Sequence, residues 1–94
     1  MRLNSKELFA VQSLLKTLDP QGQVYLFGSR ADDARRGGDI DLFLEASRRL
    51  DLKTTLSVQY RLTEACDSKV DLLVKNPEDP DQVIFQVARE GVRL

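Results

Sequence analysis

The chain has 94 residues, 41% of them hydrophobic and 31% charged, which is typical of one soluble globular domain and argues against disorder. Its 14 basic and 15 acidic residues give a net charge of −1, so it lacks the strongly basic character of a general nucleic-acid-binding protein. Because it contains no histidine, histidine-based catalysis and histidine metal ligation are excluded.

The cysteine content and the apolar runs indicate where the protein resides. A single cysteine, Cys66, leaves no internal disulfide to form and fits a reducing compartment. The start of the chain lacks the basic and then apolar pattern of a secretory signal, and no apolar run approaches the ~20 residues that cross a bilayer. We therefore expect a cytoplasmic protein without membrane association.

The first predicted element is a helix. Asn4 and Glu7 have the spacing of a capping box, and apolar residues follow at helical spacing as far as Leu18. Pro20 ends this helix, and an apolar strand over 23–27 comes next.

The remaining predicted elements continue the alternation of helix and strand. In order, they are a short helix from Ser29 to before Gly37, a strand over 39–44, a helix capped by Asp51 that runs to about Cys66, a strand over 69–75, and a helix that begins near Asp79 or Asp81 and ends at Gly91. Residues 92 and 94 are expected to pack back onto the body. The order α-β-α-β-α-β-α predicts one α/β or α+β domain over residues 1–94.

Three aspartates interrupt the apolar strands, where aspartate is disfavoured. Asp39 and Asp41 are two residues apart in one strand and therefore share a face, and Asp71 lies inside the apolar run of the next strand. The alternate positions should point into the core; they are Ile40, Leu42, Leu44, Val70, Leu72 and Val74. We expect the three carboxylates on the opposite, open face.

A glycine turn precedes these strands. Gly28 and Ser29 follow the first strand, where backbone N–H groups at a helix start can approach phosphate. Arg30 beside them would offset the charge of a triphosphate. Carboxylate oxygens are the ligands that Mg²⁺ prefers, so the combined pattern indicates a Mg²⁺–nucleotide site. Taken singly, Asp39 could be a turn residue and Asp71 a solvated residue on an edge strand.

Gly28-Ser29, nine residues and then Asp39-Ile40-Asp41 resembles the signature of the polymerase-beta-type nucleotidyltransferase superfamily. The resemblance spans nearly the whole chain, through residues 26–30, 37–42, 70–72 and 89–92. The size is similar to that of minimal nucleotidyltransferases of bacteria and archaea, many of which pair with a helical HEPN-type partner. One departure is Asp32-Asp33, where many relatives carry a basic residue and a glycine; it affects the loop's phosphate contacts rather than the metal site.

The resemblance implies an α+β fold with α/β-like alternation: a small mixed sheet of three or slightly more strands, with helices on one face and the active site on the other. It also implies Mg²⁺-dependent transfer of NMP, above all AMP, from an NTP such as ATP to a hydroxyl of a partner protein, by the antitoxin of a toxin–antitoxin pair. Two Mg²⁺ ions roughly 3.5–4 Å apart would stabilise the attacking and leaving oxygens. The expected site residues are the catalytic, metal-binding Asp39, Asp41 and Asp71 and the nucleotide-binding Gly28, Ser29 and Arg30.

Other functions were weighed against this one. A phosphatase with an aspartyl nucleophile usually has threonine or valine after its second aspartate, where this chain has Leu42, and a nucleotide-sugar glycosyltransferase needs a much longer chain. The alternative from another class is a catalytically silent binding protein that neutralises or chaperones a helical partner. Clustered acids argue against it, because unpaired carboxylates on one face repel. Since 94 residues leave little surface to enclose a base or an acceptor, a partner or a second copy of the chain could complete the site.

Overall fold

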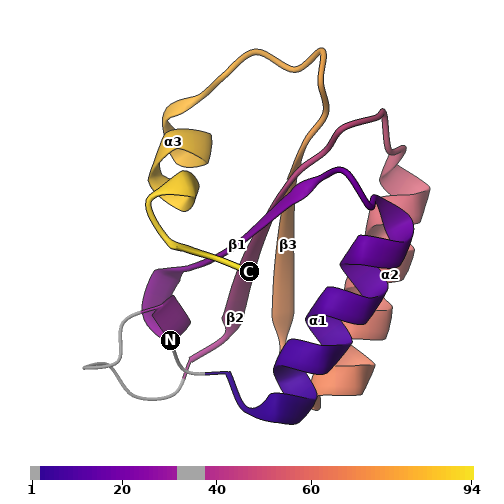
Figure 1. Ribbon diagram of the computed structural model, residues 1–94, viewed down its shortest axis with the longest axis vertical. Helices are drawn as coiled ribbons and strands as arrows, with labels where there is room; N and C mark the ends of the chain where they lie inside the picture. Colours follow the sequence, from indigo (N-terminus) through magenta and orange to yellow (C-terminus); the bar gives the residue numbers. More distant parts are fainter. Residues whose placement is uncertain (1–2, 32–37) are drawn as a thin grey trace.

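The computed structural model describes residues 3–31 and 38–94, whose elements follow the predicted order (Figure 1). They are α1 (Ser5–Leu18), β1 (Gln23–Phe27), the 3₁₀ helix η1 (Gly28–Ala31), β2 (Ile40–Glu45), α2 (Leu52–Cys66), β3 (Val70–Lys75), α3 (Val83–Arg89) and β4 (Val92–Arg93). The strands of this part form one mixed sheet in the order β3-β2-β1-β4, in which β2 and β3 are parallel and the other pairs antiparallel. The predicted α+β fold class is confirmed.

The two long helices begin and end where local sequence signals place them. The Asn4 side chain accepts the Glu7 N–H at 2.7 Å and the Glu7 carboxylate accepts the Asn4 N–H at 2.9 Å, which completes the capping box of α1. Asp51 caps α2 by accepting the Thr54 N–H at 2.7 Å, and α2 ends at Cys66 with Asp67 as its C-cap, whose φ of 50° is left-handed. In the described residues, no helix is both long and apolar enough to span a membrane.

The main core lies between the sheet and the helices α1 and α2, which cover the same face (Figure 1). Alternate residues of the strands meet apolar residues of both helices, as the spacing predicts. The buried members are Val11, Leu15, Val24, Leu26, Ile40, Leu42, Leu44, Ala46, Leu50, Val58, Leu62, Cys66 and Val70. Of the predicted core positions, Leu72 and Val74 are only partly buried, because β3 is an edge strand.

The other face of the sheet is covered in part by α3, which corrects the expectation of helices on one face (Figure 1). Phe43 of β2 points to this face and is fully buried, with its ring 5.4 Å from that of Phe85 and 5.8 Å from that of Tyr25 between centroids. Arg89 fastens α3 to β2, since its Nη2 lies 2.6 Å from Glu45 Oε2. An aromatic cluster on this face is apolar surface that needs cover, and α3 supplies it.

Two short elements differ in kind from the prediction. Val92, which was expected only to pack against the body, lies in the strand β4 and pairs with Leu26. Just after β4, the Leu94 N–H donates to Val24 O at 2.8 Å. The described part of the expected short helix from Ser29 is a 3₁₀ helix over Gly28–Ala31. The rest of that expected helix, with Asp32-Asp33, lies outside the described residues.

Candidate active site

The parallel pairing of β2 with β3 places Asp41 directly beside Asp71. Residues paired in register point to the same face, and here that face is the one turned away from α1 and α2. Asp39 comes just before β2, and its side chain is about half exposed. On the other side of Asp41, β1 contributes Phe27. The three predicted carboxylates therefore gather at one end of two neighbouring strands.

The electrostatics of Asp41 show that these carboxylates influence one another. Burial raises the pKa of the Asp41 carboxyl, the negative charges of Asp71 and Asp39 raise it further, and Lys69 lowers it by a smaller amount. Lys69 Nζ lies 3.8 Å from Asp39 Oδ2 in an exposed ion pair. The net result is a raised pKa, which is the response of a partly buried carboxyl that also has like charges beside it. A bound cation would relieve that repulsion.

Gly28 brings the turn after β1 against the same carboxylate. Its φ of +72° is in the left-handed region, and a Cβ at this position would collide with Asp41 Oδ2. The backbone of the turn therefore lies directly on Asp41, with no side chain between them. The described start of the short helix expected at Ser29 is the 3₁₀ helix η1, which is wound more tightly than an α-helix.

Ser29 lies next to the segment that leads into Asp39. Gly38 has a φ of +92°, and a Cβ there would collide with the Ser29 Oγ. The two glycines thus keep both close approaches open: the turn on Asp41, and Ser29 against the residue before Asp39. The structure brings together Gly28, Ser29 and all three aspartates, although the roles assigned to them stay predictions.

Arg30, which the sequence predicts to bind phosphate, points toward α1. Its Nη1 lies 3.3 Å from Glu7 Oε1, and its Nε donates to Gly38 O at 3.1 Å. Only 15% of the Arg30 side chain is exposed. Glu7 is thus a neighbour of the site, although the sequence pattern marks it only as part of a capping box. No local sequence signal indicates this second contact, because Arg30 lies 23 positions away.

The donor chemistry of the site fits a hard divalent cation. Three carboxylates offer oxygen ligands, which Mg²⁺ prefers, and their proximity is visible in the raised pKa of Asp41. Among residues 3–31 and 38–94, however, no group of three or more Asp, Glu, Cys or His side chains is already positioned to hold a metal ion. The Asp39 carboxylate instead pairs with Lys69, a residue that the sequence pattern does not place in the site.

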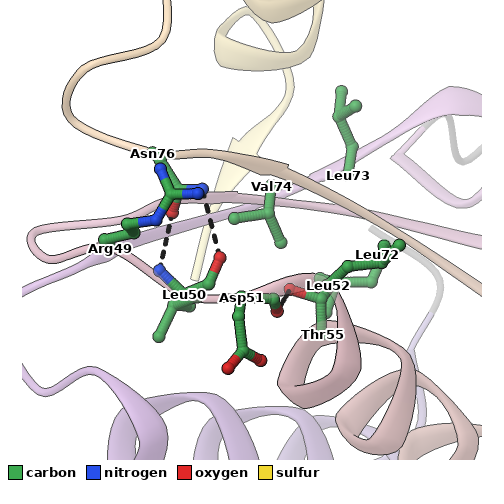
Figure 2. Close-up of a pocket in the computed structure, with 9 residues that line it drawn as sticks. All are labelled: Arg49, Leu50, Asp51, Leu52, Thr55, Leu72, Leu73, Val74 and Asn76. Atoms are coloured by element: carbon green, nitrogen blue, oxygen red, sulfur yellow. Dashed lines mark hydrogen bonds between the residues drawn. The ribbon is translucent and has the colours of Figure 1, made fainter.

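A cavity elsewhere on the molecule is separate from these acids (Figure 2). It measures about 410 Å³ and lies between the end of β3 and the first turn of α2. Asn76 and Leu50 both line it and are hydrogen-bonded to each other: the Asn76 side chain accepts the Leu50 N–H at 2.8 Å and donates to Leu50 O at 3.1 Å (Figure 2). None of the three aspartates lines it, so the open carboxylate face and not this cavity is the candidate active site.

The sequence as a whole decides the family. Residues 10–94 match the family described as "Polymerase beta, Nucleotidyltransferase". The chain belongs to this nucleotidyltransferase family. The match covers every described residue of the carboxylate face, and it confirms both the family resemblance and the predicted enzyme class. A search of curated proteins found no match.

Solved structures of toxin–antitoxin complexes contain similar chains. One, of a mutant of the toxin–antitoxin MntA–HpeT, is 28% identical with a TM-score of 0.76 over 99% of this nucleotidyltransferase and 72% of that chain. A second holds a tri-AMPylated Shewanella oneidensis HEPN toxin in complex with MNT antitoxin, at 26% identity and a TM-score of 0.68 over 90% and 67% of the two chains. A third is a toxin–antitoxin with AMP-PNP, at 27% identity and a TM-score of 0.73 over 95% and 69%.

Proposed function

We propose that this nucleotidyltransferase is the antitoxin of a toxin–antitoxin pair and transfers AMP from ATP to a hydroxyl group of a HEPN-type partner protein. The observation that supports it most is the pairing of Asp41 with Asp71, with the Gly28 turn lying on Asp41. The similar chains belong to toxin–antitoxin complexes, of which one holds a tri-AMPylated HEPN toxin and another AMP-PNP.

Each element of the carboxylate face has a part in this reaction. Asp39, Asp41 and Asp71 would hold Mg²⁺, which when bound offsets the charge on the attacking hydroxyl and the leaving pyrophosphate. The Gly28 turn offers backbone N–H groups without a side chain in the way, so a phosphate can lie close to Asp41.

Asp71 is the residue that would receive the acceptor. It is exposed on the edge strand β3, so a hydroxyl from a second protein can reach it. The hydroxyl oxygen forms a bond to the α-phosphorus, the bond to the bridging oxygen breaks, and pyrophosphate leaves. The Asp71 carboxylate orients the hydroxyl and takes its proton.

One observation favours the catalytically silent alternative. Lys69 pairs with Asp39 and neutralises part of the carboxylate face without any metal. A protein that acts only by covering its partner would tolerate this pair, whereas a metal site requires Asp39 to exchange Lys69 for the cation. The two functions therefore differ in whether the carboxylates are needed.

The test is incubation of the protein with labelled ATP, Mg²⁺ and the purified product of the adjacent gene. We expect label on that product with the parent protein and none with Asp41→Asn, which keeps the size of the side chain but removes its charge. Undiminished transfer by a folded Asp41→Asn protein would refute the mechanism. Full neutralisation of the partner by Asp41→Asn, without label in any reaction, would support the silent alternative.

A further inference from the structure

Arg30 contacts both α1, which lies 23 positions away in the chain, and the segment that leads into Asp39. Its Nε donates to Gly38 O at 3.1 Å and its Nη1 lies 3.3 Å from Glu7 Oε1. The Arg30 and Glu7 side chains are 15% and 8% exposed, so the ion pair is largely shielded from water. Charges that are shielded from water interact more strongly. We propose that Arg30 is a positioning residue: held by Glu7, it clamps Gly38 and thereby keeps Asp39 beside the Gly28 turn.

Glu7 is a rigid anchor for this clamp. Its carboxylate also accepts the Asn4 N–H, while its own N–H donates to the Asn4 side chain at 2.7 Å. These reciprocal bonds hold the Glu7 side chain in place before Arg30 contacts it. The thiol of Cys66 lies within the same field, since burial raises its pKa, Glu7 raises it further and Arg30 lowers it. The clamp therefore sits where the first turn of α1 meets the end of α2.

The other end of the clamp holds the entrance to the carboxylate face. Gly38 directly precedes Asp39, and it lies against the side chain of Ser29. The bond from Arg30 to Gly38 O thus draws together the segment after the Gly28 turn and the segment before Asp39. A released Gly38 would let Asp39 move relative to Gly28 and Ser29, and a displacement of about 1 Å at such a site can cost up to about a hundredfold in rate.

The two possible roles of Arg30, as a clamp on Gly38 or as a phosphate-binding residue, predict different effects of Glu7 on ATP binding. Both predictions rest on the proposed function. If Arg30 acts through Gly38, loss of Glu7 should weaken ATP binding just as loss of Arg30 does. If Arg30 instead contacts phosphate, loss of Glu7 removes a competing anion, so ATP binding should stay unchanged or tighten. The effect of Glu7, a residue outside the carboxylate face, separates the two.

The experiment measures the affinity for ATP with Mg²⁺ by calorimetry for Glu7→Ala, Arg30→Ala and the double variant. We expect each single variant to bind about tenfold more weakly, and the double variant no more weakly than Arg30→Ala, because the two residues act as a unit. Asn4→Ala is the matched control: it removes the side-chain cap and lowers stability, but it keeps the backbone N–H of residue 4 that holds the Glu7 carboxylate and the contact between Glu7 and Arg30. We expect Glu7→Gln to restore most of the affinity, because glutamine also serves in a capping box and can accept from Arg30.

Two results would overturn the clamp: unchanged or tighter ATP binding by a folded Glu7→Ala protein, or the same loss of affinity in Asn4→Ala. A second readout stays valid if the proposed function fails. Hydrogen exchange of the Ile40 amide, which donates to Lys69 O at 3.0 Å directly after Asp39, should accelerate in Glu7→Ala relative to Asn4→Ala, whether or not the parent protein binds ATP. Equal exchange in both variants would also contradict the proposal.

Discussion

Asp41 and Asp71 lie side by side on the parallel strands β2 and β3, on the face turned away from α1 and α2. Burial raises the pKa of Asp41, and the charges of Asp71 and Asp39 raise it further against the opposing effect of Lys69. The fold thus gathers three negative charges at one edge of the sheet, and their mutual repulsion destabilises the folded state.

The first prediction concerns stability and pH. Because the folded pKa of Asp41 is raised, the folded state binds a proton more readily than the unfolded chain between the two pKa values. The contribution of the Asp41 carboxyl to the free energy of unfolding is largest below the unfolded pKa of about 3.9, and it is lost as the pH rises through the folded pKa. We therefore expect Asp41→Asn, without metal, to be more stable than the parent at pH 7 by a few tenths to about 1 kcal/mol.

Urea denaturation at pH 7 and pH 4 measures this difference, which should shrink at the lower pH. Glu90→Gln is the matched control, because it removes one negative charge from an exposed residue at the end of α3. An Asp41→Asn protein less stable than the parent at pH 7 would contradict the effect of the carboxylate cluster.

The second prediction separates two acids in one segment. Asp71 lies beside Asp41, whereas Asp67 ends α2 with a φ of 50°. We expect Asp71→Ala to abolish transfer but to bind ATP nearly as the parent does, because Asp39 and Asp41 would hold the metal that carries the triphosphate. Asp67→Asn should keep both properties, since asparagine tolerates the left-handed conformation that alanine does not. Transfer and ATP-affinity assays on both variants check this, and an active Asp71→Ala protein would show that the assignment is wrong.

The third prediction concerns Gly28→Ala. The positive φ alone should cost about 1–2 kcal/mol of stability, and the new methyl group would meet the Asp41 carboxylate. We also expect weaker ATP binding, because the backbone of the turn moves away from Asp41. In an Asp41→Ala background the stability cost should fall to that of the backbone strain. Equal costs in both backgrounds, measured by thermal unfolding, would mean that the turn does not lie on Asp41.

The fourth prediction concerns a buried acid away from the active site. Asp19 at the end of α1 is 1% exposed, and its carboxylate accepts the Ser47 N–H at 2.7 Å and also the Ser47 hydroxyl. Burial raises the pKa of Asp19, but the hydrogen bonds from Ser47 and Gln21 and the charge of Arg48 together lower it by more, so the net pKa lies below its usual value. Stability from this group is therefore present above the unfolded pKa and lost as the pH falls through the folded pKa.

We expect Asp19→Ala to lose about 1–3 kcal/mol at pH 7, because the Ser47 groups lose their acceptor. Ser47→Ala should lose less, since its backbone N–H still reaches Asp19. In urea denaturation, the difference in the free energy of unfolding between Asp19→Ala and the parent should be smaller at pH 3.5 than at pH 7. A difference that stays constant with pH would contradict the role of the ionised carboxylate.

Features that depend on neighbouring residues were predictable from the sequence. The capping box of Asn4 and Glu7 and the cap at Asp51 involve residues three apart, so they specify where α1 and α2 begin. The alternation along β2 likewise places Asp41 opposite the core residues, because successive side chains of a strand point to opposite faces. The family signature, from Gly28 to Asp41, is also contained in a short stretch of chain.

Features that depend on distant partners were decided only by the tertiary structure. Helix α3 covers the second face because Phe43, Tyr25 and Phe85 cluster there, and no local pattern states where Phe85 will pack. Arg30 meets Glu7 across 23 positions of sequence, which turns a residue that sequence alone assigned to phosphate toward α1. The sequence by itself thus determined which side chains share a strand face and which turn precedes them. The pairing of Asp41 with Asp71 and the contact of Arg30 with Glu7 arise only when the packed core sets strand register and helix position, because those contacts join segments that are remote in the chain.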